Sequence, residues 1–207
     1  MLKTFYNKNT LEAGIDEAGR GPLFGRVYIG CCILHPDDNN DLIKDSKKLS
    51  QRKLLIAYDY VKENAIDFST FWLDANDIDE LNILQATMKG MHEVVNNLNV
   101  KPDFLLVDGN SFYPYFDKNN KKINHKCIIS GDNTYTCIAG ASILAKVERD
   151  KYIEELCKNN SNMNLDEKYG LLSNKGYGTK KHINGIKKYG ITKWHRKSFG
   201  ICKTLSK

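Results

Sequence analysis

Residues 13–23 read AGIDEAGRGPL, an apolar segment that ends at the adjacent acids Asp16 and Glu17 and continues into glycines. The apolar start predicts a β-strand, and the glycines predict a connection to a second strand over Val27–Leu34. A single acid after a strand is an ordinary turn residue, but two adjacent acids between apolar residues and glycine are less easily explained that way. The segment therefore predicts a charged site at the end of the first strand.

Two later apolar runs also end at acids. Phe104–Val107 leads into Asp108, and Lys126–Ile129 leads through a glycine to Asp132. Alternatively, Asp108 before glycine is a common turn residue and Asp132 is a helix cap. Acids at strand ends can converge on one edge of a sheet, where their mutual repulsion raises their pKa values unless cations neutralise them. Oxygen ligands suit Mg²⁺ or Mn²⁺, so the pattern favours a divalent-metal site.

Helical spacing dominates other parts of the chain. Apolar residues recur every three or four positions from Leu81 to Leu98, which predicts an amphipathic helix. Small residues in the helix expected over Thr134–Cys157 predict close packing against a sheet. The remaining expected elements are a helix from Ser50 to about Asn64, a strand over Ile66–Leu73, and short basic helices after Asn162 and Thr179. Strands that alternate with helices predict an α/β or mixed-sheet domain with a helical C-terminal part.

Charge is distributed unevenly along the chain. The segment from Lys168 to Lys207 contains 11 Lys and Arg residues and no Asp or Glu, which leaves 20 basic and 25 acidic residues before it. The C-terminal segment therefore carries a charge of +11 and the rest of the chain carries −5. Aromatic residues lie between the cations, a mixture that suits stacking on bases and neutralisation of phosphates. The alternative is a plain solvated basic face.

Composition excludes several classes of protein. The chain has 207 residues, of which 41% are hydrophobic and 27% charged, which excludes collagen-like and wholly disordered proteins and fits one domain. Its longest apolar run is too short to span a bilayer. The six cysteines have no CxxC spacing, which favours free thiols in a reducing, cytoplasmic compartment. No phosphate-loop, HExxH or GxSxG pattern occurs, so those chemistries are not indicated.

Together these motifs resemble the ribonuclease HII family over about residues 12–200. The first segment looks like the family's N-terminal signature. The other motifs follow in the family's order: DSKKL at 45–49, LNILQATM at 81–88, VDGN at 107–110, GD at 131–132, ASILAKVERD at 141–150, NKGYGT at 174–179 and HRKSF at 195–199. The resemblance implies an α/β, RNase H-like fold: a mixed five-stranded sheet flanked by helices, with a helical C-terminal segment. It also implies a single domain over 1–207, with a catalytic core over 1–160 and a basic helical segment over 161–207.

The activity of the family is implied in the same way. Its members cleave the RNA strand of RNA/DNA hybrids and cut 5′ of single ribonucleotides embedded in duplex DNA, which leaves 3′-hydroxyl and 5′-phosphate ends. The resemblance assigns metal binding and catalysis, with two divalent ions that are Mg²⁺ or Mn²⁺, to Asp16, Glu17, Asp108 and Asp132. Asp150 competes for the fourth position, but it lies about four turns into its helix, which favours Asp132.

The residues that the resemblance implies as nucleic-acid contacts are Gly19, Arg20, Gly21, Lys47, Lys48 and Tyr177. The Gly-Arg-Gly segment reads the ribose 2′-hydroxyl largely through backbone groups, where glycine permits close approach. Tyr177 matches the family's tyrosine that stacks on the sugar at the RNA–DNA junction. Lys47 matches a basic residue near the scissile region, and we expect Lys48 to contact a phosphate. We expect a monomer with no obligatory protein subunit, no membrane association and no tail that binds a sliding clamp.

Some features depart from the usual pattern of the family. Phe24 and Arg26 stand where the family has small or proline residues, and Arg26 could alter the grip on substrate. A polar insertion over Asp117–Asn124 predicts a surface loop. The related ribonuclease HIII carries an extra N-terminal domain, for which the dozen residues before the first motif leave no room. A non-catalytic hybrid-binding module is the other alternative, and four clustered acids beside bound phosphates argue against it.

Overall fold

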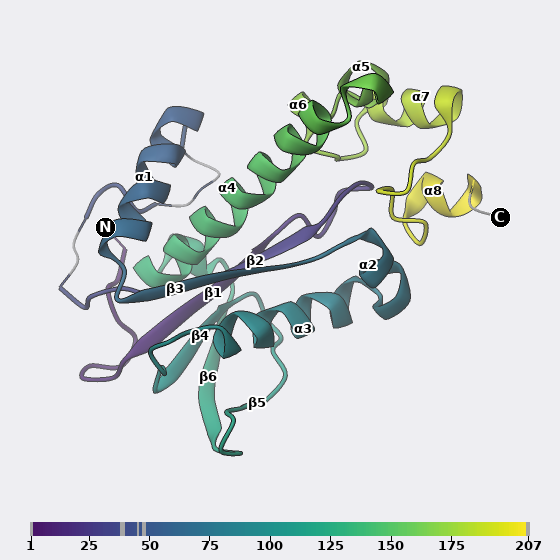
Figure 1. The fold of residues 1–207 in the computed structure, drawn as a ribbon. Helices are drawn as coiled ribbons and strands as arrows, with labels where there is room; N and C mark the ends of the chain where they lie inside the picture. The colour runs from purple at the N-terminus through teal and green to yellow at the C-terminus, as the bar shows by residue number, and fades with distance from the viewer. Residues whose placement is uncertain (1, 38–39, 45, 47–48, 206–207) are drawn as a thin grey trace. The chain divides into compact units, whose positions relative to one another are not determined.

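The computed structural model describes residues 2–37, 40–44, 46 and 49–205, and Figure 1 labels its elements. The strands are β1 (Glu12–Ala18), β2 (Val27–Ile33), β3 (Asp67–Leu73), β4 (Phe104–Asp108), β5 (Tyr115–Phe116) and β6 (Lys122–Ile128). The helices are α1 (Gln51–Asn64), α2 (Ala75–Leu81), α3 (Ile83–Asn96), α4 (Thr136–Asn159), α5 (Leu165–Tyr169), α6 (Leu171–Asn174), α7 (Lys180–Tyr189) and α8 (Gly200–Leu205). Short 3₁₀ turns cover Gly131–Asn133 and Ser161–Met163.

The strands form one mixed sheet in the order β3-β2-β1-β4-β6-β5 (Figure 1). β1 pairs antiparallel with β2 and parallel with β4, and β4 pairs parallel with β6. The predicted RNase H-like mixed sheet with flanking helices is confirmed, but the prediction of five strands is wrong, because the sheet has six. The additional strand is β5, a two-residue strand that pairs antiparallel with β6.

The polar insertion explains this difference. The side chain of Asp117 accepts hydrogen bonds from the backbone N–H groups of Asn119 and Lys121, both at 2.9 Å. These bonds close a tight turn, which is a typical role for Asp. β6 can therefore begin at Lys122, four residues before the predicted start, and the expected surface loop over Asp117–Asn124 is instead a turn followed by the start of a strand.

The amphipathic helix predicted from Leu81 to Leu98 is α3, which covers Ile83–Asn96, and a separate short helix, α2, precedes it. Asp74 caps α2 through a capping box with Asp77, so helix formation starts before the periodic apolar residues. Asn82 has φ of +63°, a conformation that ends α2, and its side chain accepts from the N–H groups of Leu84 and Gln85. The same residue therefore ends one helix and caps α3. Ser50 caps α1 as predicted.

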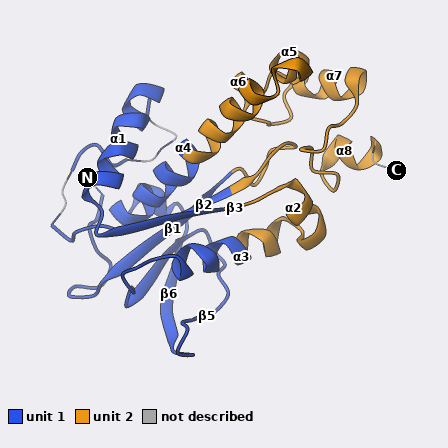
Figure 2. Cartoon of the chain, viewed as in Figure 1, with its two compact units in different colours: residues 1–18, 28–71, 88–147 blue, residues 19–27, 72–87, 148–207 orange. Residues whose placement is uncertain are grey.

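The chain divides into two compact units (Figure 2). Unit 1 comprises residues 1–18, 28–71 and 88–147, and unit 2 comprises residues 19–27, 72–87 and 148–207. The predicted division at residue 160 stays a prediction. Within the described part of the chain, no helix combines the length and apolar character needed to cross a membrane.

In unit 1, small residues bring α4 close to the sheet, as predicted. A Cβ atom added to Gly14 on β1 would collide with the backbone of Cys137, and one added to Gly30 on β2 would collide with the carbonyl of Ala141. Gly140 faces Cys32 in the same way. The strands that carry the first acids are thus held against α4 at short range, which restricts where their ends can move.

In unit 2, the core forms around Phe24, which is fully buried. The other buried apolar residues of this core are Ile153, Leu165, Tyr169, Leu171, Ile186 and Cys202. They come from α4, α5, α6, α7 and α8, so the basic C-terminal helices share an apolar core with the segment that follows β1. Phe24, a departure from the family pattern, is therefore a core residue.

Candidate functional site

Sheet geometry in unit 1 brings two predicted acids together. Ile15 of β1 pairs with Val107 of β4 in parallel register. The next residues, Asp16 and Asp108, therefore emerge side by side from neighbouring strands. Glu17 follows Asp16 directly, so three carboxylates from two strands share one region of the sheet.

The environment of Asp16 is strongly unfavourable for its negative charge. The residue is 4% exposed. Burial raises the pKa of the Asp16 carboxyl well above its usual value, and the negative charges of Glu17 and Asp108 raise it further. A hydrogen bond with Ser142 and another from the backbone N–H of Glu17, at 2.7 Å, act in the opposite direction. Asp16 is thus held in place while its charge is left for a cation to neutralise.

Two serines form a hydrogen-bonded pair next to Asp16. Ser142 of α4 hydrogen bonds Asp16, and its hydroxyl lies 3.0 Å from that of Ser46. A serine hydroxyl has one proton. Because Ser142 directs its proton to the carboxylate, its oxygen accepts from Ser46. Both serines are buried and lie in sequence motifs quoted above, but their roles were not predicted from the sequence.

Asp132, the fourth predicted acid, lies in the 3₁₀ turn after β6 and is 1% exposed. The backbone N–H of the preceding Gly131 donates to Asp108 Oδ1 at 2.6 Å, which ties this turn to the end of β4. The side-chain amide of Asn133 donates to Asp132 Oδ1 at 3.1 Å. The competing candidate, Asp150, belongs to unit 2.

The donor chemistry of these residues fits a hard divalent cation, because all the ligands are carboxylate oxygens and Asp16 needs a counter-charge. The side-chain positions are a different matter. Among the described residues, no group of three or more His, Cys, Asp or Glu side chains already has the geometry to hold a metal ion.

Unit 2 contains the Gly-Arg-Gly segment over residues 19–21, which is predicted to contact the ribose 2′-hydroxyl and is called the reading segment below. Gly19 has φ of +91°, a conformation that L side chains rarely adopt, and a Cβ atom there would collide with the side chain of Arg149. A Cβ atom on Gly21 would lie 3.4 Å from the ring of Tyr177. The Gly-Arg-Gly segment and Tyr177 are thus neighbours, and the Tyr177 ring is 50% exposed. Lys47 and Lys48 lie outside the described residues.

Arg26, the other departure from the family pattern, is stacked between two aromatic rings. Its guanidinium carbon lies 3.3 Å from the ring centre of Trp72 and 4.6 Å from that of Tyr152. Such cation–π contacts stabilise a guanidinium at a protein surface. The side chain is therefore engaged within unit 2.

Sequence reasoning missed the buried polar residues behind the reading segment. Arg149, Arg196, His182 and His195 are all nearly inaccessible and hydrogen bond backbone groups of unit 2. Arg149, His195 and Arg196 lie in motifs quoted above, but no role was assigned to them. Because the motif at 195–199 also contains the exposed Lys197, the sequence alone does not separate buried from exposed basic residues.

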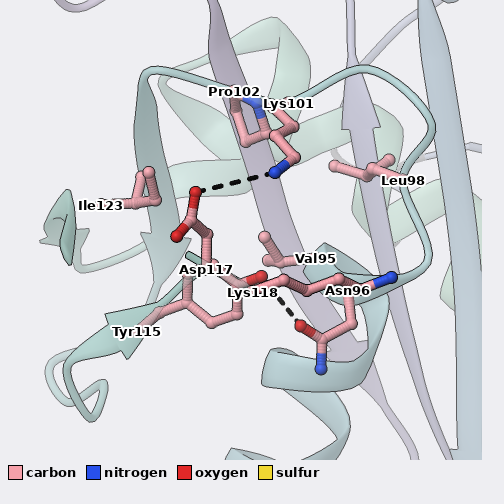
Figure 3. A pocket seen from close by; sticks show the side chains of 9 residues that line it. All are labelled: Val95, Asn96, Leu98, Lys101, Pro102, Tyr115, Asp117, Lys118 and Ile123. Atoms are coloured by element: carbon pink, nitrogen blue, oxygen red, sulfur yellow. Dashed lines mark hydrogen bonds and ion pairs between the residues drawn. The ribbon is translucent and has the colours of Figure 1, made fainter. Parts of the chain in front are cut away.

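A pocket in unit 1 contains none of the predicted site residues (Figure 3). It has a volume of about 70 Å³. Figure 3 shows the Lys101–Asp117 ion pair at 3.7 Å and the hydrogen bond from the Tyr115 hydroxyl to Asn96 Oδ1 at 2.8 Å. These contacts join α3 and the segment between α3 and β4 to the β5–β6 hairpin, so we assign the pocket to packing around the hairpin.

A mixed sheet with acids at the ends of β1 and β4 defines the chain as an RNase H-like nuclease. Residues 13–202 match the family model described as Ribonuclease HII. The chain belongs to the ribonuclease HII family. It is therefore a type 2 ribonuclease H, an enzyme class that depends on divalent metal and acts on RNA/DNA hybrids.

Comparison with individual proteins agrees with this assignment. A ribonuclease HII from Phocaeicola vulgatus is 41% identical over 204 residues, which cover 99% of this chain and 96% of that protein. One from Christiangramia forsetii is 42% identical over 200 residues, covering 97% and 96%. The crystal structure of the ribonuclease H2 from Pyrococcus horikoshii OT3 superposes with a TM-score of 0.73 at 25% identity, covering 94% of this chain and 96% of that one.

Proposed function

We propose that this ribonuclease H cuts the RNA strand of RNA/DNA hybrids and also cuts 5′ of single ribonucleotides in duplex DNA. Hydrolysis uses two divalent ions and leaves 3′-hydroxyl and 5′-phosphate ends. The observation that carries the proposal is the buried Asp16 carboxylate, whose pKa is raised by burial, Glu17 and Asp108. A site of this kind favours cations next to a phosphate-bearing substrate.

The side chains of unit 1 hold and orient the metal ligands. Asp16, Glu17, Asp108 and Asp132 would hold Mg²⁺ or Mn²⁺ through carboxylate oxygens, and the bound metal would supply a polarised water and charge stabilisation at the departing 3′-oxygen. The Gly131 N–H orients Asp108. The Ser142 hydroxyl and the Glu17 N–H hydrogen bond the Asp16 carboxylate and orient it.

Substrate selection falls to unit 2 and the two lysines near the start of α1. The backbone of Gly19, Arg20 and Gly21 reads the ribose 2′-hydroxyl, and the exposed Tyr177 ring stacks on the sugar at the junction. Lys47 and Lys48 contact phosphates. The basic C-terminal segment adds non-specific attraction to the duplex, which weakens as salt rises. We also propose that the enzyme acts as a monomer without an obligatory subunit.

The test is cleavage of a DNA duplex that contains one ribonucleotide. The purified protein is incubated with this duplex in Mg²⁺, in Mn²⁺ and in EDTA, and a long RNA/DNA hybrid and an all-DNA duplex serve as comparison substrates. We expect a metal-dependent cut on the 5′ side of the ribonucleotide, with ligatable 3′-hydroxyl ends. Cleavage of the hybrid alone would remove junction specificity from the proposal. Binding of both substrates without any cut would favour the hybrid-binding module instead.

A further inference from the structure

One guanidinium holds most of the reading segment in unit 2. Arg196 is 0% exposed and is the largest fully buried side chain among the described residues. Its Nε donates to the Gly25 carbonyl at 2.9 Å, its Nη1 to the Arg20 carbonyl at 2.9 Å and its Nη2 to the Gly19 carbonyl at 2.6 Å. Burial lowers the pKa of Arg196 to about 9, so the guanidinium stays charged at neutral pH. The planar fork fixes three carbonyls at once, which a lysine cannot do.

A second arginine completes the support. Arg149 donates to the carbonyls of Arg26, at 3.1 Å, and Phe24, at 3.3 Å. The N–H of Gly25 donates to the Trp194 carbonyl at 2.8 Å. The backbone from Gly19 to Arg26 is therefore held by bonds to distant residues, although its glycines would otherwise leave it free to move.

His195, the residue before Arg196, is linked to Tyr177 by a chain of hydrogen bonds. His195 Nδ1 accepts from the Thr192 N–H at 2.9 Å, so its proton is on Nε2. His195 Nε2 lies 3.2 Å from His182 Nε2 and must donate to it, which places the His182 proton on Nδ1. His182 Nδ1 then donates to the Tyr177 carbonyl at 2.9 Å. The contacts thus fix one tautomer for each neutral imidazole, in agreement with burial, which lowers the pKa of both.

We propose that His195 and Arg196 are positioning residues that set the spacing between the Gly19–Gly21 backbone and Tyr177. Arg196 fixes the first element directly, and His195 fixes the second through His182. This inference rests on the proposed function, which assigns ribose and junction reading to these two elements. A purely structural role would account for the burial of His195 and Arg196. However, the hydrogen bonds of these two adjacent residues connect them both to the Gly19–Gly21 backbone and, through His182, to Tyr177.

The variants test separately the Arg196 bonds to the backbone and the hydrogen-bond chain from His195 through His182 to Tyr177, which together form the network. His182→Phe removes the donor to Tyr177 and keeps the ring, whereas His182→Asn places an amide N–H near the position of Nδ1. Arg196→Lys keeps the charge and loses the fork. Ile186→Ala is the control, because Ile186 is buried in the same core and has no part in the network. Steady-state kcat and KM are measured on the single-ribonucleotide duplex and on a long RNA/DNA hybrid, below the melting temperature of every variant.

We expect His182→Phe to lower kcat/KM on the single-ribonucleotide duplex by about tenfold more than on the long hybrid, because only the first substrate needs the junction contact. His182→Asn restores most of this ratio. Arg196→Lys lowers kcat/KM on both substrates, because both carry the 2′-hydroxyl. Ile186→Ala leaves the ratio of the two substrates at the parent value. The inference is overturned if His182→Phe and Ile186→Ala give the same ratio of kcat/KM on the single-ribonucleotide duplex to kcat/KM on the long hybrid.

Two further results keep the test decisive. If the parent enzyme does not cut the single-ribonucleotide duplex, the proposed function fails. With an active parent, an unchanged substrate ratio in His182→Phe and an unchanged kcat/KM in Arg196→Lys overturn only the positioning roles. Nitrogen NMR of the parent reports the histidine tautomers without any substitution, so it remains informative if a variant does not fold. We expect the proton on Nε2 of His195 and on Nδ1 of His182, and the opposite pair contradicts the network.

Discussion

Unit 1 buries the Asp16 carboxylate beside two further acids, whereas unit 2 buries the Arg196 guanidinium against three backbone carbonyls. Both side chains are removed from water, which is unfavourable for an ion unless partners compensate. Arg196 has its compensation within the protein. Among the described residues, the charged neighbours that shift the pKa of Asp16 are negative, so a bound cation would supply its counter-charge.

The difference separates two tasks of one enzyme. A region that binds a cation works best when the metal-free state is electrostatically strained, because the strain is relieved only on binding. A region that reads a sugar works best when its backbone is fixed in advance, because ordering it during binding would weaken the complex. Substitutions in unit 1 should therefore affect chemistry and metal, and those in unit 2 should affect substrate choice.

The largest effect is expected for Asp108→Asn. The amide keeps an oxygen that can accept from the Gly131 N–H, so the turn that carries Asp132 should stay in place. The loss of a charged metal ligand should lower the single-turnover cleavage rate by about 10³-fold while hybrid binding in EDTA is retained. Rapid-quench assays and fluorescence anisotropy check the two parts. An undiminished cleavage rate would show that Asp108 is not in the site.

The second prediction concerns acid sensitivity in unit 2. Burial lowers the pKa of His195 to about 3, below the ordinary value of 6.5, so the unfolded chain binds a proton that the folded chain excludes. Stability should therefore be intact above pH 6.5 and fall as the pH drops toward 3, with a loss of about 2 kcal/mol from this residue at pH 5. Urea unfolding of His195→Gln, whose side chain does not titrate, should fall less steeply between pH 7 and 5. Parallel curves for the two proteins would contradict the network.

Tyr177→Ala gives a smaller effect that is confined to substrate choice. We expect cleavage at a single ribonucleotide to fall about tenfold, because stacking on an aromatic ring is worth about 1–3 kcal/mol. Tyr189→Ala is the matched control, since Tyr189 is 47% exposed against 50% for Tyr177 and lies in the same basic segment. Cleavage assays on both substrates check this. Equal effects of the two variants would remove the junction role from Tyr177.

The smallest expected effect is a gain in stability. Asp16→Asn removes a buried charge that two neighbouring acids oppose, so the metal-free variant should be more stable than the parent by about 1 kcal/mol at pH 7. The sign follows from the raised pKa of Asp16, because ionisation at neutral pH then works against folding. Chemical unfolding in EDTA measures the difference. A destabilised variant would mean that the carboxylate is already compensated within unit 1.

Local patterns were enough to predict the strands that carry the first candidate acids. The strand that ends at Asp16 and the strand that ends at Asp108 follow from short apolar runs, and parallel pairing then places the acids together. The break at Asn82 was missed because a single left-handed residue leaves the apolar period intact. The early start of β6 was missed because its first residues are largely polar and pair through the backbone.

The support in unit 2 could not be predicted from local patterns. Arg196 and Gly25 are 171 residues apart in the sequence, so no local period links the donor to its acceptor. The chain of tautomers from Thr192 to Tyr177 depends in the same way on which nitrogen faces which carbonyl. Such information exists only once the segments are packed together.

Calorimetric titration of Mn²⁺ tests whether the carboxylates of unit 1 bind the catalytic cation. Mn²⁺ is titrated into the parent, into Asp16→Asn and into Tyr177→Ala at pH 7 without nucleic acid. We predict binding to the parent and to Tyr177→Ala with the same affinity, and a loss of that binding in Asp16→Asn. Equal Mn²⁺ affinity in all three proteins would place the metal elsewhere and contradict the account.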